Sequence, residues 1–187
     1  MPKYKMKIIS QIEDAWQLLR EGKIIAHPTE AIYGLACDPF NKEAVERVLT
    51  LKQRLVSKGF IILIADWSQL KSLIEPLSDH LLAPVRATWP GPVTWIFPKS
   101  SIIPDWLCGD QNTVAIRMSN HPIAHNLSIQ GPVVSTSANL SGHAPARDVH
   151  ELSLQFPKGI DALLTGELGS ESEPSAIYDV QTGKRLR

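Results

Sequence analysis

Short apolar runs of strand length alternate with helical segments along most of this chain, and this alternation limits its fold more than any other feature. The apolar runs predict strands at 23–27, 59–65, 93–97, 113–118, 132–138, 160–165 and 175–180. Segments with apolar residues at helical spacing predict helices that begin near residues 10, 41, 66, 78 and 148. Interleaved strands and helices of this kind favour an α/β fold built on a mixed sheet.

Residues that cap helices stand at four of the expected helix starts. S-x-x-E and D-x-x-E patterns begin at Ser10 and Asp148 and predict capping boxes. Asn41 and Asp66 are suited to accept a hydrogen bond from the first turn of the helix that follows each of them. Gly22 is suited to end the first helix. These signals agree with the boundaries that the apolar pattern gives.

The composition is that of an ordinary globular protein. Apolar residues make up 43% of 187 residues, and no linker divides the chain, so we expect one domain over 1–187. Lys plus Arg and Asp plus Glu both number 19, so the overall charge argues neither for nor against nucleic acid. Two cysteines are too few for a disulfide framework or a cysteine-rich zinc cluster. No run approaches the ~20 apolar residues of a membrane span or forms a signal peptide, so we expect a cytoplasmic protein.

The stretch AHPTEAIYGLACDPF, residues 26–40, carries polar side chains that a strand leading into a loop does not need for folding. Thr29, Glu30 and Tyr33 stand directly after a buried apolar run. They predict a small polar platform that holds a ligand.

The stretch STSANLSG, residues 135–142, places Ser135, Ser137 and Asn139 on one face if the chain is extended there. Three small side chains that can donate hydrogen bonds suit a cradle for phosphate or carboxylate oxygens. The alternative is a serine-rich turn that caps the next element. We favour the cradle because other parts of the sequence also offer anion-binding groups.

Those groups include the cations of LKQRLVSKG, residues 51–59. Lys52, Arg54 and Lys58 leave a helix and enter a strand, and such a cluster suits a polyphosphate. The alternative is the solvated, charged end of a helix. Arg117 ends an apolar strand, where a guanidinium is costly unless it is paired. It either forms a salt bridge with an acidic side chain or binds an anionic ligand.

Several common motifs are absent from the chain. It has no P-loop, no G-x-G-x-x-G and no G-x-S-x-G, so neither the usual nucleotide loops nor a hydrolase nucleophile is indicated. His121 and His125 lack a third ligand and are better explained as histidines of a surface helix than as a zinc site. The tail GKRLR is basic and short, and either touches RNA or is solvated.

The segments AHPTEAIYGLACD, LKQR with SKG, WPGPVTWIF, VAIR and STSANLSG together resemble the YrdC-domain family, in its short bacterial form. They occur in the family's order and spacing and cover essentially the whole chain. The resemblance implies a single twisted, open, mixed sheet with flanking helices and a large concave groove.

The resemblance also implies an enzyme that makes threonylcarbamoyl-AMP and pyrophosphate from L-threonine, bicarbonate or CO₂, and ATP. Mg²⁺ is expected as an ion held by ATP rather than by a protein cage. Partner proteins would then move the threonylcarbamoyl group to N6 of adenosine 37 in tRNA, and direct contact with tRNA stays open.

Site residues follow from the same resemblance. The threonine side is implied for Thr29, Tyr33, Arg117 and Ser137, and the nucleotide side for Lys52, Arg54, Lys58, Ser135, Asn139 and Arg147. The catalytic groups implied among them are Lys52, Arg54 and Ser137. The sequence departs from the family at Leu55 and Gly59, where prolines are common, and at Ala176, where a hydroxyl is lost.

Two other functions fit the same residues. One is a module that binds structured RNA through a basic groove, without turnover. The other is a carbamoyl-transfer domain that handles carbamoyl adenylate, which is disfavoured because such domains sit inside much longer chains.

Overall fold

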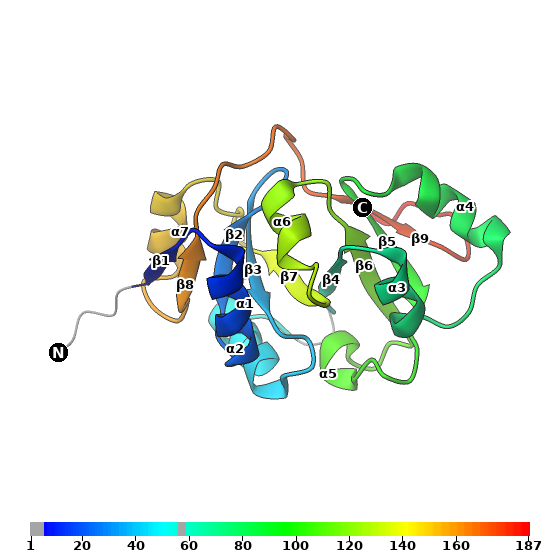
Figure 1. The fold of residues 1–187 in the computed structure, drawn as a ribbon, viewed down its shortest axis with the longest axis horizontal. Coiled ribbons are helices and arrows are strands. Elements are labelled where there is room, and N and C mark those ends of the chain that lie inside the picture. Colours follow the sequence, from blue (N-terminus) through cyan, green and yellow to red (C-terminus); the bar gives the residue numbers. More distant parts are fainter. Residues whose placement is uncertain (1–5, 56–58) are drawn as a thin grey trace.

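A computed structural model describes residues 6–55 and 59–187 and confirms the α/β fold with a mixed sheet. Its nine strands form one sheet in the order β1-β8-β2-β3-β7-β4-β6-β5-β9 (Figure 1). Five of the eight pairs of neighbouring strands in this sheet include at least one of the central strands β3, β7, β4 and β6. The strands are β1 (Lys7–Ile9), β2 (Ile25–Pro28), β3 (Tyr33–Cys37), β4 (Ile61–Ile64), β5 (Val93–Pro98), β6 (Thr113–Met118), β7 (Val133–Ser137), β8 (Ala162–Leu164) and β9 (Ala176–Asp179).

The helices flank the sheet, and most of their predicted caps are present. Asn41, Asp66 and Asp148 each accept a hydrogen bond from a backbone N–H of the helix that follows. The capping box predicted at Ser10 is wrong, because the first helix is preceded by Gln11, which makes no side-chain cap. The helices are α1 (Ile12–Arg20), α2 (Lys42–Lys52), α3 (Trp67–Leu73), α4 (Asp79–Thr88), α5 (Asp105–Cys108), α6 (Pro122–Leu127) and α7 (Val149–Gln155). None of them is long and apolar enough to cross a membrane.

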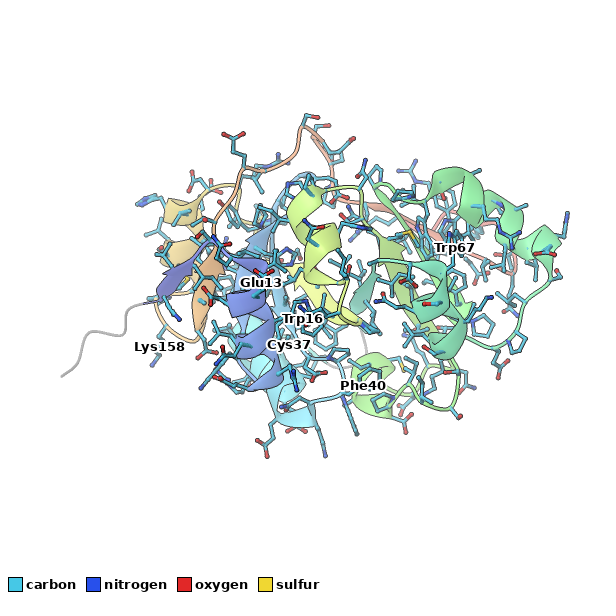
Figure 2. All side chains as sticks on the ribbon, viewed as in Figure 1. Glu13, Trp16, Cys37, Phe40, Trp67 and Lys158 are labelled. Atoms are coloured by element: carbon cyan, nitrogen blue, oxygen red, sulfur yellow. The ribbon has the colours of Figure 1, made fainter. Side chains whose placement is uncertain are left out.

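Alternation along the strands divides the apolar core into two clusters. Ile62 of β4 and Val134 of β7 belong to the larger cluster, which α2 and α5 help to cover. Their neighbours Leu63 and Val133 point the other way and join the smaller cluster under α1 and α6. In Figure 2, Trp16 lies on α1 beside the smaller cluster, and Trp67 lies on α3 toward the other end of the sheet. The face that carries Leu63 is hollowed between the central strands.

Lys52 ties the end of α2 to the turn that follows β7. Its ammonium donates to the carbonyl oxygen of Ser137, to that of Asn139 at 3.0 Å and to Asn139 Oδ1 at 3.2 Å. The backbone adds a further bond, from the N–H of Ser141 to the carbonyl of Lys52, at 2.9 Å. The side chain is only 2% exposed. Lys52 therefore fixes the end of β7, the strand that carries the STSAN hydroxyls.

We expect a Lys52→Met variant to change how stability depends on pH. Burial, with the nearby charge of Arg54, lowers the pKa of Lys52 to about 7. Between that pH and about 10.4, the unfolded chain holds a proton that the native protein lacks, so the native state gains stability as pH rises. The free energy of unfolding of the unaltered chain should therefore rise relative to Lys52→Met, by up to about 1.4 kcal/mol per pH unit.

Urea unfolding at a series of pH values from 7 to 10 measures this difference. Lys71→Met, which removes an exposed lysine of α3, is the matched control and should show a flat difference. A flat difference for Lys52→Met as well would contradict the prediction.

Candidate active site

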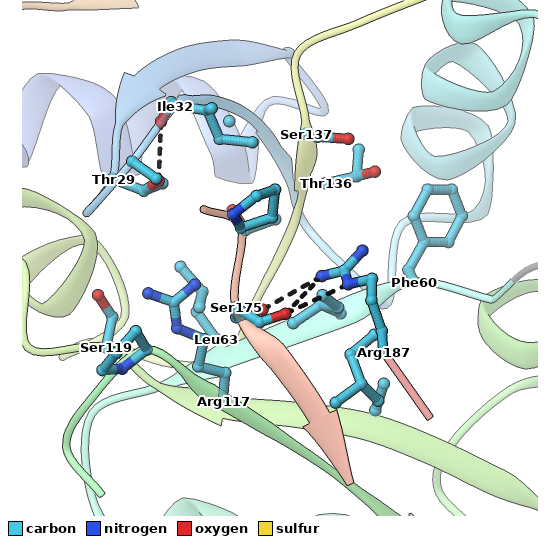
Figure 3. A pocket seen from close by; sticks show the side chains of 18 of the residues that line it. Thr29, Ile32, Phe60, Leu63, Arg117, Ser119, Thr136, Ser137, Ser175 and Arg187 are labelled. Atoms are coloured by element: carbon cyan, nitrogen blue, oxygen red, sulfur yellow. Dashed lines mark hydrogen bonds between the residues drawn. The ribbon is translucent and has the colours of Figure 1, made fainter. Parts of the chain in front are cut away.

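One face of the central strands is hollowed, and side chains from six strands line the hollow. Leu63 of β4 and Arg117 of β6 are register partners on this face. Ser135 of β7 and Gly34 of β3 continue the same face across the sheet. The hollow has a volume of about 260 Å³, just below the roughly 300–1,000 Å³ of small-molecule sites. Its walls combine apolar side chains such as Phe60 and Leu63 with hydroxyl and guanidinium groups (Figure 3).

Most of the site residues expected from the sequence converge on this hollow. Of the expected residues, those that line it are Thr29, Tyr33, Arg54, Arg117, Ser135 and Ser137. Lys52, Asn139 and Arg147 do not line it, and Lys58 lies outside the described residues. The chain therefore brings together groups that are more than 100 positions apart in sequence, such as Thr29 and Ser135.

Lys52 and Asn139 hold the wall rather than form it, which departs from their expected contact with a nucleotide. The ammonium of Lys52 is enclosed by the oxygen acceptors of the turn. Asn139 Oδ1 accepts from Lys52 and from Ser137, while Nδ2 donates to the carbonyls of Leu140 and His143, both at 2.9 Å. Both side chains are thus engaged within the turn.

Arg117 meets both alternatives that the sequence left open, because it forms an ion pair and also lines the hollow. Its guanidinium is paired with the carboxylate of Glu30, and its Nε donates to the carbonyl of Gly91 at 3.2 Å. Ser119 Oγ donates to Glu30 at 2.6 Å. Burial alone would raise the pKa of the Glu30 carboxyl, but the charge of Arg117 and the Ser119 hydroxyl outweigh it and the pKa is lowered. Glu30 therefore stays ionised and holds Arg117 in place.

Arg54 and Arg187 bring two more guanidinium groups to the hollow. Arg54 donates to Thr136 Oγ1 at 3.1 Å and to the carbonyl of Gly59 at 2.8 Å. Burial and the charge of Arg187 lower the pKa of Arg54, and burial and the charge of Arg117 lower that of Arg187. The three cations therefore share one electrostatic environment, which favours an anionic ligand.

Arg187 belongs to the basic tail, and no sequence pattern predicted a place for it in the site. The tail folds back on β9 after a turn at Gly183, which has φ +68°, and Tyr178 bridges Arg185 in antiparallel fashion. Arg187 then donates through Nη2 to the carbonyl of Ser175 at 2.8 Å (Figure 3). The glycine three residues after the expected strand at 175–180 was the signal for this hairpin.

A strap formed by residues 165–175 runs between β8 near one edge of the sheet and β9 at the other (Figure 1), and Glu173, Pro174 and Ser175 at its end line the hollow. Gly169 N–H donates to the carbonyl of Thr29 at 2.9 Å, and Glu171 N–H donates to that of Glu30 at 3.0 Å. A Cβ at Gly169 would lie 2.6 Å from the carbonyl oxygen of Glu30, so glycine allows this close approach. The exposed Arg147 donates to the carbonyl of Ser172 at 2.6 Å and supports the strap from outside.

The described side chains at the hollow do not form a set of ligands that could hold a metal ion without help from a substrate. Among the described residues, no group of three or more His, Cys, Asp or Glu side chains is placed to hold a metal. The acidic side chains at the hollow are Glu30, which is paired with Arg117, and Glu173 of the strap.

Comparisons with a family model and with known proteins point to the same family. The Sua5/YciO/YrdC family model, described as telomere recombination, matches residues 17–187. A threonylcarbamoyl-AMP synthase of Coxiella burnetii is 48% identical over 178 residues, covering 94% of this chain and 96% of that protein. One of Methylococcus capsulatus is 48% identical over 171 residues, covering 90% of this chain and 92% of that protein.

Solved structures agree with the fold. The P. abyssi Sua5 structure complexed with L-threonine has a TM-score of 0.87 and 30% identity, and covers 97% of this chain. This chain spans only 56% of that Sua5 chain. E. coli YciO has a TM-score of 0.79 and 25% identity, with 96% of this chain and 90% of YciO covered. On its matched residues and its relatives, this chain belongs to the Sua5/YciO/YrdC family.

Proposed function

We propose that this protein is a threonylcarbamoyl-AMP synthase, which forms threonylcarbamoyl-AMP and pyrophosphate from L-threonine, bicarbonate or CO₂, and ATP. The observation that carries the proposal is the convergence of Arg54, Arg117 and Arg187 with the hydroxyls of Thr29 and Ser135 in one hollow. Such a hollow offers cations for a triphosphate and a carboxylate, and polar groups for an amino acid. The activity named for relatives at 48% identity supports the same assignment.

The proposed roles follow from where each group lies. Arg54 and Arg187 bind the phosphates of ATP, and Arg117 binds the carboxylate of threonine while Glu30 holds it from behind. Thr29 and Tyr33 form the wall beside the amino acid. Lys52 acts on the reaction by fixing the end of β7, which carries Ser137.

The chemistry needs no covalent intermediate on the protein. The amine of threonine adds to CO₂ and gives a carbamate, whose oxygen attacks the α-phosphate of ATP as pyrophosphate leaves. Alignment of two reactants can lower the barrier by about 7–11 kcal/mol. The guanidinium groups neutralise the charge on the phosphates as the bond to pyrophosphate breaks. Mg²⁺ would be held mainly by ATP and would neutralise phosphate charge. Glu173 is the carboxylate of the hollow that is not engaged by Arg117.

The product would pass to partner proteins that transfer the threonylcarbamoyl group to N6 of adenosine 37 in tRNA. We propose that the protein works in the cytoplasm for that reason, and we leave open whether it touches tRNA itself. The alternative is an RNA-binding groove without turnover. It is less well supported because it would explain the cations, as contacts to a phosphodiester backbone, but not the wall formed by Thr29 and Tyr33.

Release of pyrophosphate from ATP tests the proposal directly. We expect release that requires both threonine and bicarbonate, because the carbamate is the attacking group. Omission of either compound should abolish it. Pyrophosphate release that ignores threonine, or RNA binding that weakens steeply with salt while no pyrophosphate forms, would favour the alternatives.

An Arg54→Gln variant should fold and lose most of its synthesis. Hydrogen bonds to a charged group contribute about 1.5–3 kcal/mol, so kcat/KM for ATP should fall about 10- to 100-fold. Arg86→Gln, which removes an exposed arginine of α4 paired with Asp79, is the control and should leave kcat/KM unchanged. Equal activity of the two variants would remove Arg54 from the site.

An Arg117→Lys variant should raise KM for threonine about 10-fold or more while KM for ATP changes little, because lysine keeps the charge opposite Glu30 but cannot fork onto a carboxylate. Steady-state kinetics with each substrate varied in turn separate the two constants. If KM rises for ATP alone, Arg117 belongs to the nucleotide side instead.

A further inference from the structure

Three hydroxyl groups that line the hollow have their protons directed into the protein. Thr29 Oγ1 donates to the carbonyl of Ile32 at 2.7 Å (Figure 3). Ser137 Oγ donates to Asn139 Oδ1 at 2.6 Å. Neither acceptor oxygen carries a proton, so neither bond can reverse. These two hydroxyls therefore present lone pairs to the hollow.

The third hydroxyl, that of Ser135, is bound to a group that can act in either direction. Ser135 Oγ lies 3.1 Å from Nε2 of His27, a side chain with no exposed surface. A neutral imidazole carries one proton, and the nitrogen that holds it is set by the partner of the other nitrogen. The direction of the bond to Ser135 therefore depends on Nδ1 of His27.

The Nδ1 atom lies 3.1 Å from the carbonyl oxygen of Pro28, which can only accept. Nδ1 must therefore carry the proton. Burial lowers the pKa of His27 to about 4, so the ring is neutral near pH 7 and Nε2 has no proton. Ser135 must then donate to Nε2, and its hydroxyl shows lone pairs to the hollow as the other two do.

The sheet is built to allow this bond. His27 and Gly34 are register partners on β2 and β3, and β7 with Ser135 is the next strand. A Cβ at Gly34 would lie 2.9 Å from His27 Nε2 and 2.9 Å from Ser135 Oγ. The imidazole thus reaches across the glycine to the serine, a contact that any side chain at residue 34 would break.

We propose that His27 is a positioning residue, which fixes Ser135 as a hydrogen-bond acceptor so that this wall binds the N–H or O–H donors of the amino-acid substrate. The inference rests on the proposed function and departs from the expected role of Ser135 on the nucleotide side. A hydroxyl that offers only lone pairs repels a phosphate oxygen, whereas it binds the amine or the β-hydroxyl of threonine. The guanidinium groups of Arg54, Arg117 and Arg187 supply the donors for the anionic parts of both substrates.

The state of the imidazole is measurable without any assay. In a ¹H–¹⁵N spectrum of the imidazole nitrogens at pH 7, His27 should show a protonated Nδ1 and a bare Nε2. The signals are assigned by their loss in His27→Asn. A protonated Nε2 would overturn the proposal, since Ser135 would then accept from His27.

A double-mutant cycle tests the action of His27 through Ser135. The amide of His27→Asn can still donate to the Pro28 carbonyl but is too short to reach Ser135, and Ser135→Ala removes the acceptor itself. Each should raise KM for threonine about 10- to 100-fold, with KM for ATP nearly unchanged. In the Ser135→Ala background, His27→Asn should have no further effect. Additive losses, or a rise in KM for ATP alone, would overturn the proposal.

The donor group is identified with valine, which matches threonine in shape but lacks the hydroxyl. Binding of both amino acids in the presence of ATP is measured for the unaltered chain and for His27→Asn. A loss confined to threonine assigns Ser135 to the β-hydroxyl, and an equal loss for both assigns it to the amine. No loss for either overturns the proposal. A chain that neither binds threonine nor releases pyrophosphate would contradict the proposed function, while the imidazole spectrum would still decide the orientation of Ser135.

Discussion

The ion pair between Glu30 and Arg117 is the constraint on which the rest of the hollow depends. The two residues lie on separate parts of the sheet, since Glu30 follows β2 and Arg117 is in β6, with β3, β7 and β4 between those strands. Both side chains are nearly buried, so removal of either partner leaves a charge without compensation and costs about 3–5 kcal/mol. The backbone carbonyl of Glu30 also accepts a hydrogen bond from Glu171 of the strap. Glu30 therefore fixes both the Arg117 cation and the strap beside the hollow.

Much of the fold could be predicted because the apolar runs are long enough to mark buried strands. The runs at 59–65 and 113–118 became β4 and β6, and the caps at Asn41 and Asp66 were correct. The sequence missed β3, because YGLAC is buried on both faces and so shows no alternation. It also missed the short α5, whose four residues are too few for a periodic signal. The helix expected around His121 and His125 is α6, but His121 precedes it and is buried. Short elements depend on tertiary contacts that no local pattern reports.

The site was predicted where the side chains lie on strands, and less well where a helix ends. Arg117, Ser135 and Ser137 face the hollow because strand alternation fixes their direction. Lys52 and Arg54 were expected to act together in one cationic cluster for a polyphosphate. Lys52 instead ends α2, and Gln53 at φ 51° turns the chain into the left-handed region, so the two cations separate. Arg187 reaches the hollow only after the tail has folded onto β9, a contact that spacing alone does not reveal.

The hydrogen-bond directions of the groups that line the hollow say more about its ligand than the identity of the residues does. A groove for a nucleic-acid backbone needs donors throughout, because every phosphate oxygen it meets is an acceptor. Here guanidinium donors share the hollow with Thr29, Ser135 and Ser137, whose protons are already directed into the protein. A ligand that satisfies both must carry anionic oxygens and its own N–H or O–H donors within a few ångströms. An amino acid beside a nucleotide triphosphate has that combination. A phosphodiester backbone would leave the hydroxyl oxygens of Thr29, Ser135 and Ser137 without hydrogen-bond donors.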